Sequence, residues 1–141
     1  KRNGFGSYYY KNGNRYEGEW LNNRKDGKGI YYYTSKAYYN GDWSHDKKSG
    51  KGIFHYETGH KYTGEFNNDE INGYGQCLYK NGDVYEGNYK NNRKNGIGIY
   101  RFADNVTKYT GEWLDDQING QGVYIYKDGT KYARDPAIAF R

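Results

Sequence analysis

Short segments of the chain alternate between aromatic or glycine residues and charged residues. In residues 16–20, Tyr, Gly and Trp occupy every second position, and Glu17 and Glu19 lie between them. Alternate side chains of a β-strand lie on the same face, so this pattern predicts a strand with one aromatic and one charged face. A second segment starts at the pair Gly27 and Gly29 and continues into tyrosines at residues 31–33. The two segments predict a β-hairpin whose second strand begins at the glycine pair.

This hairpin pattern recurs along the chain. Tyr-x-Gly-x-aromatic segments follow one another in steps of 23, 23, 23 and 24 residues. A Gly-x-Gly pair keeps the same rhythm, from Gly4 to Gly120. Recurrence at one fixed period indicates a repeat protein. We predict a repeat array over residues 1–132, with a partial repeat at 4–15 and repeats that start near residues 16, 39, 62, 85 and 109.

The fold predicted by this array is all-β: an elongated single-layer antiparallel sheet of stacked β-hairpins, with about 23 residues per repeat. Dipeptides such as Asn12-Gly13 and Asn81-Gly82 tolerate positive φ and predict tight turns between repeats. Polar connectors are expected within the hairpins, at residues 21–25, 44–48, 67–71, 90–94 and 114–118.

Residues 133–141 leave the repeat. Asp135 followed by Pro136 is a typical helix start, which predicts a short helical cap. A frayed end is the alternative.

Composition indicates a thin, aromatic core. Hydrophobic residues make up 34% of the 141 residues, and 20 of the residues are tyrosine and 21 are glycine. Disordered chains are poor in aromatic residues, which argues against disorder here. The glycines lie on the aromatic face, where they leave room for rings to lie against the backbone.

No catalytic or metal-binding constellation is visible. His45, His55, His60 and the single Cys77 lack metal-ligand spacing. The Gly-x-Gly pairs lack the strand-to-helix context of a phosphate-binding loop. We therefore predict no enzyme activity, no metal and no cofactor. No apolar run is long enough to span a membrane as a helix.

The motifs together resemble the MORN repeat family, whose unit is Tyr-x-Gly-x-aromatic, a connector, and then Gly-x-Gly, at about 23 residues. The resemblance covers nearly the whole chain. It implies a grooved sheet that serves as a protein-interaction scaffold, often at membranes or the cytoskeleton, and that frequently self-associates. A connector glycine common in that family is replaced here. Residues that also accept left-handed backbone conformation hold or flank its position: Asn23, Asp46, Asp69, Asn92 and Asp116.

A one-layer sheet cannot hide both faces, so some rings must meet water or a partner. Most rings are expected to pack on one another, and a subset to form a protein-binding aromatic face, since Tyr and Trp are enriched in binding hot spots. The residues predicted for this face are Trp20, Tyr31, Trp43, Phe54, Phe66, Tyr89, Tyr100, Trp113 and Tyr124.

Basic residues near the connectors form the alternative site, which would contact anionic phospholipid or phosphoinositide headgroups. These residues are Arg24, Lys25, Lys28, Lys47, Lys48, Lys51, Arg93 and Lys94. The competing interpretation is that they keep the sheet soluble and discourage edge pairing. Carboxylates such as Glu65 and Glu112 interrupt the basic positions and argue against nucleic-acid binding.

The sequence thus favours a non-catalytic scaffold, the repeat portion of a larger cytosolic protein, which binds a protein partner along an aromatic groove. The partner along this groove would be a helix of another protein or a second copy of the chain, which would form a homodimer. The alternative is a peripheral-membrane module. The predicted location is the cytoplasm, and more narrowly the periphery of a membrane or of the cytoskeleton. A choline-binding type of wall repeat is disfavoured, because only three tryptophans are present.

Overall fold

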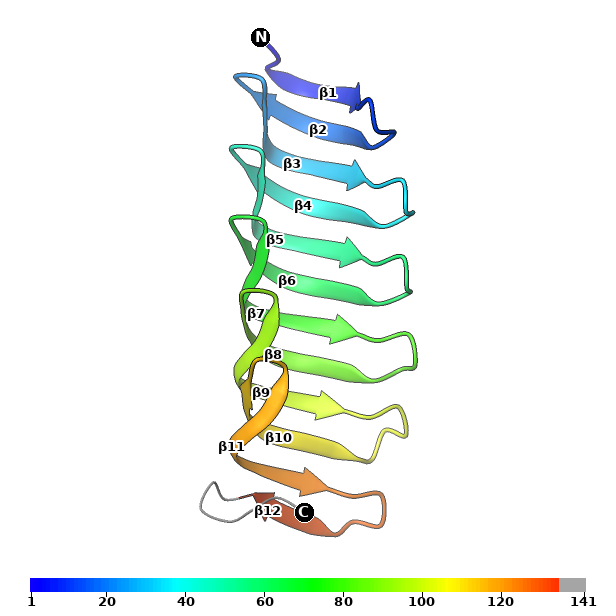
Figure 1. Cartoon of the computed structure of the whole chain (residues 1–141), viewed down its shortest axis with the longest axis vertical. Helices are drawn as coiled ribbons and strands as arrows, with labels where there is room; N and C mark the ends of the chain where they lie inside the picture. The colour runs from blue at the N-terminus through cyan, green and yellow to red at the C-terminus, as the bar shows by residue number, and fades with distance from the viewer. Residues whose placement is uncertain (135–141) are drawn as a thin grey trace. The chain divides into compact units, whose positions relative to one another are not determined.

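The computed structural model describes residues 1–134, and these residues form β-strands and no helix. The strand order in the sheet follows the chain, and neighbouring strands pair antiparallel, which confirms the predicted all-β fold of hairpin repeats. Figure 1 shows the strands connected by alternating turns. The strands are β1 (Gly4–Tyr9), β2 (Arg15–Leu21), β3 (Arg24–Tyr32), β4 (Tyr38–Ser44), β5 (Lys47–His55), β6 (Lys61–Asn67), β7 (Glu70–Leu78), β8 (Val84–Lys90), β9 (Arg93–Arg101), β10 (Lys108–Leu114), β11 (Gln117–Ile125) and β12 (Lys131–Arg134).

The chain divides into two compact units, Lys1–Ile71 and Asn72–Arg141. In the first unit, strands β1 to β6 pair in sequence, and glycines lie opposite glycines: Gly6 pairs with Gly18, Gly18 with Gly29, and Gly29 with Gly41. The second unit repeats this register from β7 to β11, with Gly75 opposite Gly87. Its last described strand is β12, and the predicted C-terminal cap at residues 135–141 lies outside the described residues.

The turns within the hairpins are shorter than the sequence predicts. Only Asn22 and Asn23 separate β2 from β3, and both have positive φ, at 51° and 67°. Two such residues in succession form a type I′ turn, whose twist matches that of the strands it joins. Strand β3 therefore begins at Arg24 and not, as predicted, at the glycine pair. The expected left-handed conformation is confirmed at all five substituted connector positions: Asn23, Asp46, Asp69, Asn92 and Asp116.

The first glycine of a pair marks a bulge in the hairpins β2–β3, β4–β5, β8–β9 and β10–β11. Gly18 pairs with Gly29 and Trp20 with Lys25, so this part of β3 is two residues longer than its partner in β2. Gly27 lies in the extra length with a φ of 93°, a conformation that favours glycine. The bulge lets the tip of the hairpin leave the line of the sheet, as the ribbons in Figure 1 show.

One tyrosine per repeat forms the centre of the core. Tyr16 is fully buried, and its hydroxyl donates to the Glu19 carbonyl at 2.9 Å. A Cβ built on Gly29 would overlap the Tyr16 ring, so the ring lies directly on the glycine backbone as predicted. The equivalent tyrosines Tyr39, Tyr62, Tyr85 and Tyr109 are buried in the same way.

The aromatic residue four positions after the buried tyrosine completes the core. Trp43 packs edge-on against Tyr39, with ring centroids 5.1 Å apart, and its indole N–H donates to the Gly29 carbonyl at 3.1 Å. Trp20 and Trp113 make the equivalent bonds to Gly6 and Gly98. Each indole therefore ties its hairpin to the preceding one, and its own N–H has a carbonyl acceptor.

Candidate functional site

The predicted aromatic face separates into two layers. Trp20, Trp43, Phe66, Tyr89 and Trp113 are buried, with at most 8% of their surface exposed, and belong to the core. The remaining predicted residues are half-buried and reach the surface: Tyr31, Phe54, Tyr100 and Tyr124. Only this second set is placed to meet a partner.

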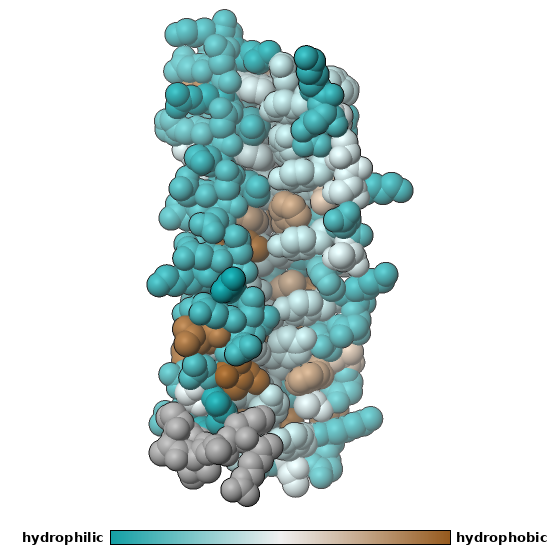
Figure 2. Space-filling model, viewed as in Figure 1, coloured by the Kyte–Doolittle hydropathy of each residue, from teal (hydrophilic) through white to brown (hydrophobic). Residues whose placement is uncertain are grey.

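Six rings of the first unit form a continuous surface, which we call the ring ladder: Tyr8, Tyr10, Tyr31, Tyr33, Phe54 and Tyr56. Within a row, ring centroids lie 4.7 Å apart in Tyr8–Tyr10, 4.8 Å in Tyr31–Tyr33 and 4.6 Å in Phe54–Tyr56. Between rows, Tyr10 lies 5.5 Å from Tyr31, and Tyr33 lies 5.8 Å from Phe54. Figure 2 shows weakly polar surface, the hydropathy expected of tyrosine, between strongly polar margins.

The second unit carries equivalent rows, although Cys77 takes the place of the first ring in the row of Tyr79. Tyr79 lies 5.7 Å from Tyr100, and Tyr100 lies 5.0 Å from Phe102. A small hollow of about 150 Å³ opens in this unit, lined by Tyr100, Phe102, Tyr109, Trp113, Ile118 and Tyr124. Ile118 stands at the repeat position that holds lysine in other repeats.

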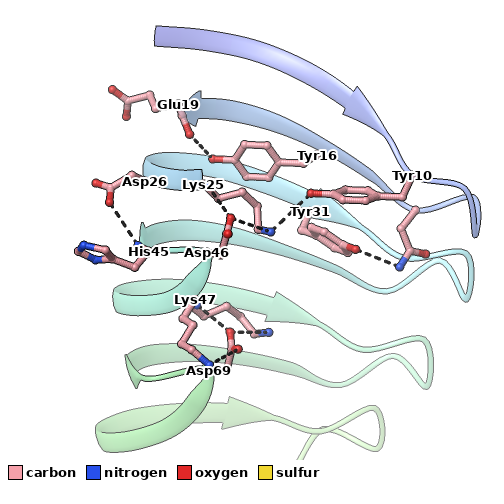
Figure 3. A network of polar contacts seen from close by, with 12 residues as sticks. Tyr10, Tyr16, Glu19, Lys25, Asp26, Tyr31, His45, Asp46, Lys47 and Asp69 are labelled. Atoms are coloured by element: carbon pink, nitrogen blue, oxygen red, sulfur yellow. Dashed lines mark hydrogen bonds and ion pairs between the residues drawn. The ribbon is translucent and has the colours of Figure 1, made fainter. Parts of the chain in front are cut away.

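Those lysines lie beneath the rings. The Lys25 side chain is only 12% exposed, and its ammonium lies 5.1 to 5.8 Å from the ring centroids of Trp43, Tyr31, Tyr10 and Tyr16. It also donates to the Tyr10 hydroxyl at 3.5 Å. Figure 3 shows this cation between the rings. A desolvated ammonium beside aromatic faces gains cation–π attraction, and we call each such arrangement a lysine cage.

Lys48 and Lys94 occupy equivalent cages. Lys48 lies 5.7 Å from the Tyr39 ring centroid and 5.8 Å from that of Phe54, and it donates to the Tyr33 hydroxyl at 3.3 Å. Burial lowers the pKa of Lys48, and this is only partly offset by the Asp69 carboxylate. Lys94 is caged in the second unit by Tyr79, Tyr85 and Trp113.

An acidic turn residue of the next hairpin closes each cage. The Asp46 backbone N–H donates to the Lys25 carbonyl at 2.9 Å, and Asp46 Oδ1 accepts from the Lys25 backbone N–H at 2.7 Å. Asp69 clamps Lys48 in the same way, and Asp116 clamps Lys94. The connector residues that replace the family's glycine thus join consecutive repeats.

Burial also affects the ladder hydroxyls. It raises the pKa of Tyr10 to about 12, with the neighbouring Tyr31 adding to the effect. The same causes raise the pKa of Tyr33 to about 12. These hydroxyls are therefore neutral and able to donate hydrogen bonds at physiological pH.

The basic residues predicted to contact lipid lie in different environments, and only some of them are exposed. Lys25, Lys48 and Lys94 are the caged lysines, with at most 14% of their side chains exposed. The neighbouring Arg24, Lys47 and Arg93 are exposed. Lys28 and Lys51 each lie between the two glycines of a Gly-x-Gly pair, on the face of the sheet opposite the ring ladder. Lys28 pairs with Asp42. Contact with lipid stays a prediction, and it rests on the exposed side chains.

Sequence analysis did not assign Tyr10, Tyr33, Tyr56, Tyr79, Phe102 or Tyr126 to the site, although their alternation placed them on the glycine face. It also missed the cages. A signal was present: lysine is followed 21 or 22 residues later by aspartate at Lys25 and Asp46, Lys48 and Asp69, and Lys94 and Asp116. This spacing indicates cross-repeat ion pairs.

Within residues 1–134, no group of three or more His, Cys, Asp or Glu side chains is placed to hold a metal ion. His55 stacks on Tyr38, with ring centroids 4.1 Å apart, and His45 contacts Ser44. Cys77 is buried, and burial raises the pKa of its thiol, which disfavours the reactive thiolate. The part of the chain that the structure describes contains no helix long and apolar enough to cross a membrane.

The fold defines a β-hairpin repeat protein. Its hairpins repeat, its glycine pairs lie beneath buried tyrosines, and its strand order follows the chain. The family model "MORN repeat" matches residues 1–15, 16–38, 39–61, 62–84, 85–107 and 109–131. The chain belongs to the MORN repeat family.

Solved structures of Drosophila melanogaster proteins are similar to this chain. One is the TCP domain of SAS-4 (dCPAP) in complex with a proline-rich motif of Ana2 (dSTIL), with 18% identity, a TM-score of 0.60, and coverage of 95% of this chain and 74% of that chain. Another is the TCP10c domain of Sas-4, with 18% identity, a TM-score of 0.44, and coverage of 92% and 91%. The comparison with curated protein sequences gives no match.

Proposed function

We propose that this chain is a non-catalytic protein-interaction module whose ring ladder binds a segment of a partner protein. The observation that carries the proposal is the layering of the aromatic residues. The buried tyrosines and tryptophans form the core, while the ladder rings lie above them and remain partly exposed. Contiguous surface of this kind is typical of interaction sites.

The chemistry of the ladder fits recognition better than catalysis. Tyrosine offers a large rigid ring and one hydroxyl at low entropic cost, which is why it is frequent in binding hot spots. Aromatic side chains recur in each row of the ladder, whereas a catalytic set is usually unique in a chain. The similar TCP domain of SAS-4 was solved with a bound proline-rich motif of Ana2, which supports a peptide segment as the ligand.

Selection from a displayed library of random peptides tests the proposal. The double variant Tyr33→Ser/Tyr56→Ser removes two ladder rings near the loops. The matched control Phe5→Ser/Tyr9→Ser removes two rings from the opposite face, where they are 79% and 71% exposed. Circular dichroism checks that both variants fold.

Peptides selected on the wild-type chain are expected to bind the ladder variant at least about tenfold more weakly and the control variant with unchanged affinity. The proposal is wrong if no peptide is enriched, or if the enriched peptides do not distinguish the ladder variant from the control. Light scattering of the chain alone tests whether a second copy is the partner.

A further inference from the structure

The ladder hydroxyls are arranged as hydrogen-bond donors. Tyr10 Oη accepts from Lys25 Nζ, and Tyr33 Oη accepts from Lys48 Nζ. Tyr31 Oη accepts from Asn14 Nδ2 at 3.1 Å. An ammonium and an amide NH₂ can only donate, so each tyrosine is the acceptor in these bonds and its hydroxyl hydrogen is not used in them.

These bonds also polarise the hydroxyls that accept them. A hydroxyl that accepts a hydrogen bond from a cation is polarised and donates more strongly in turn. The caged lysines thus act on a ligand through the hydroxyls and not by direct contact. A ligand that offers hydrogen-bond acceptors, and few donors, matches this surface.

The spacing of the rows adds a second constraint. Each repeat contributes two strands, and neighbouring strands lie roughly 4.8 Å apart, so equivalent rings recur about every 9.6 Å. The first unit holds three such rows, starting at Tyr8, Tyr31 and Phe54. A ligand lying across the strands must present equivalent groups at that interval.

A polyproline II helix meets this requirement. It has three residues per turn and a rise of about 3.1 Å, which gives a pitch of roughly 9.3 Å. An extended β-strand places residues three apart on opposite faces, and two turns of α-helix span about 10.8 Å. Only the polyproline II conformation therefore repeats one face in near register with the rows.

Proline also satisfies the donor requirement. It lacks a backbone N–H, and the carbonyls of a polyproline II segment are not used internally, so the segment presents acceptors. Proline rings pack on aromatic faces in other modes of peptide recognition. The loops that follow Tyr10 and Tyr33 carry exposed Lys11 and Lys36, and these favour acidic residues beside the prolines.

We propose that the first unit binds a polyproline II segment of about seven residues that runs across its strands. Every third residue is a proline that lies on one row of the ladder. The carbonyls of the segment accept from the Tyr10 and Tyr33 hydroxyls, and acidic residues flank it near Lys11 and Lys36. The inference rests on the proposed function, because it names the ligand class of the same surface.

Fluorescence anisotropy with labelled peptides tests it. The probe is an oligoproline of about nine residues with two aspartates at one end. The comparison peptide has the same aspartates and the same length but a glycine-serine sequence. The wild-type chain is expected to bind the oligoproline at least about tenfold more tightly, a difference that requires no variant to fold.

The hydroxyl role is tested separately. The variant Tyr10→Phe/Tyr33→Phe keeps both rings and is expected to lose about tenfold in oligoproline affinity. The matched variant Tyr9→Phe, on the opposite face, is expected to change affinity less than about twofold. Equal loss in both variants would overturn the assignment of the donors.

The outcomes separate this inference from the proposed function. Equal binding of oligoproline and the glycine-serine peptide overturns the polyproline II assignment. If the peptide selection still yields ladder-dependent binders, the proposed function stands and only the ligand class is wrong. If the selection also yields no ladder-dependent binder, both are wrong.

Discussion

Asp46 holds Lys25 at three points. Its backbone N–H donates to the Lys25 carbonyl at 2.9 Å, its Oδ1 accepts from the Lys25 backbone N–H at 2.7 Å, and the same oxygen lies 3.5 Å from Lys25 Nζ. Two residues that are 21 positions apart thereby join consecutive hairpins and place a cation below the ring ladder.

Removing the Asp46 side chain should weaken the first unit. Asp46→Ala loses the acceptor for the Lys25 N–H and the partner of a desolvated ammonium, so we expect a loss of about 1.5–3 kcal/mol in the free energy of unfolding. Asp46→Asn keeps an acceptor, as Asn23 does for Arg2, and should lose less than about 1 kcal/mol. Urea unfolding measures both values. Equal losses would show that the side-chain acceptor of the Lys25 backbone N–H contributes nothing to stability.

The caged cation should be replaceable by an apolar side chain. Lys48→Met retains most of the volume between Tyr39 and Phe54 and removes a desolvated charge, so we expect a change within about 1.5 kcal/mol. The sequence itself carries isoleucine at the equivalent positions 71 and 118. Thermal or urea unfolding of Lys48→Met checks this, with Lys51→Met, an exposed lysine of the same strand, as the control. A much larger loss would mean that the cation–π contacts outweigh desolvation.

The second glycine of the pair should be irreplaceable beneath a buried tyrosine. A Cβ at Gly29 would overlap the Tyr16 ring, so Gly29→Ala should destabilise the chain by about 1–3 kcal/mol or more. Gly6 holds the same repeat position at the start of the array, but there a Cβ would lie 3.7 Å from the nearest atom, Trp20 Nε1. Gly6→Ala is therefore the matched control, and denaturant unfolding should show little change for it.

High pH should unfold the protein through its tyrosines. Burial raises the pKa of Tyr10 and Tyr33 to about 12, and it also raises the pKa of Tyr16 and Tyr39. An unfolded tyrosine has a pKa of about 10, so above that pH the unfolded state releases protons that the folded state retains. The free energy of unfolding therefore falls as pH rises from about 10 towards 12.

The measurement is a pH titration that follows tyrosinate absorbance and circular dichroism together. Exposed rings contribute an absorbance change of their own, but the ionisation of the buried rings should coincide with the loss of the β-structure signal, because those rings ionise only as the fold opens. Gradual ionisation without loss of β structure would contradict the burial of these hydroxyls.

The lipid hypothesis makes a prediction of its own. If the exposed basic residues contact anionic headgroups, Arg24→Glu/Lys47→Glu should abolish co-sedimentation with phosphatidylserine vesicles, since each basic residue contributes up to about 1 kcal/mol near such a surface. Both side chains are exposed, and the pair of Lys47 with Asp69 at 3.9 Å lies at the surface, where such pairs contribute little, so the fold should be retained. Binding of oligoproline should also be unchanged, since the ladder is untouched. Absence of wild-type co-sedimentation would dismiss the hypothesis.

The repeat period, the strand faces and the turn conformations could be predicted from sequence, because each depends on local rules. The left-handed conformation of Asp46 follows from its residue type and its place in the connector. The start of β3 could not be placed, because the bulge at Gly27 moves the turn away from the glycine pair. Lys25 was therefore assigned to a polar loop, although it lies in a strand opposite Trp20.

The burial of each ring could not be predicted from the sequence either. Alternation places Trp20 and Tyr31 on the same face, but it does not say which ring covers which. Depth is set by the bulge and by the indole bond to the carbonyl of the preceding hairpin, and both are tertiary features. A period of two residues carries no information about them.

The clamp between Lys25 and Asp46 is repeated between Lys48 and Asp69 within the first unit. The hairpin of β4 and β5 therefore contributes an aspartate to the clamp with the preceding hairpin and a lysine to the clamp with the next one. An in-frame duplication or loss of this 23-residue repeat would therefore still leave a lysine facing an aspartate at each junction that it creates. Such events would lengthen or shorten the ring ladder by one row at a time. The length of the peptide that the ladder is proposed to bind could thus change in evolution while the contacts within each repeat stay the same.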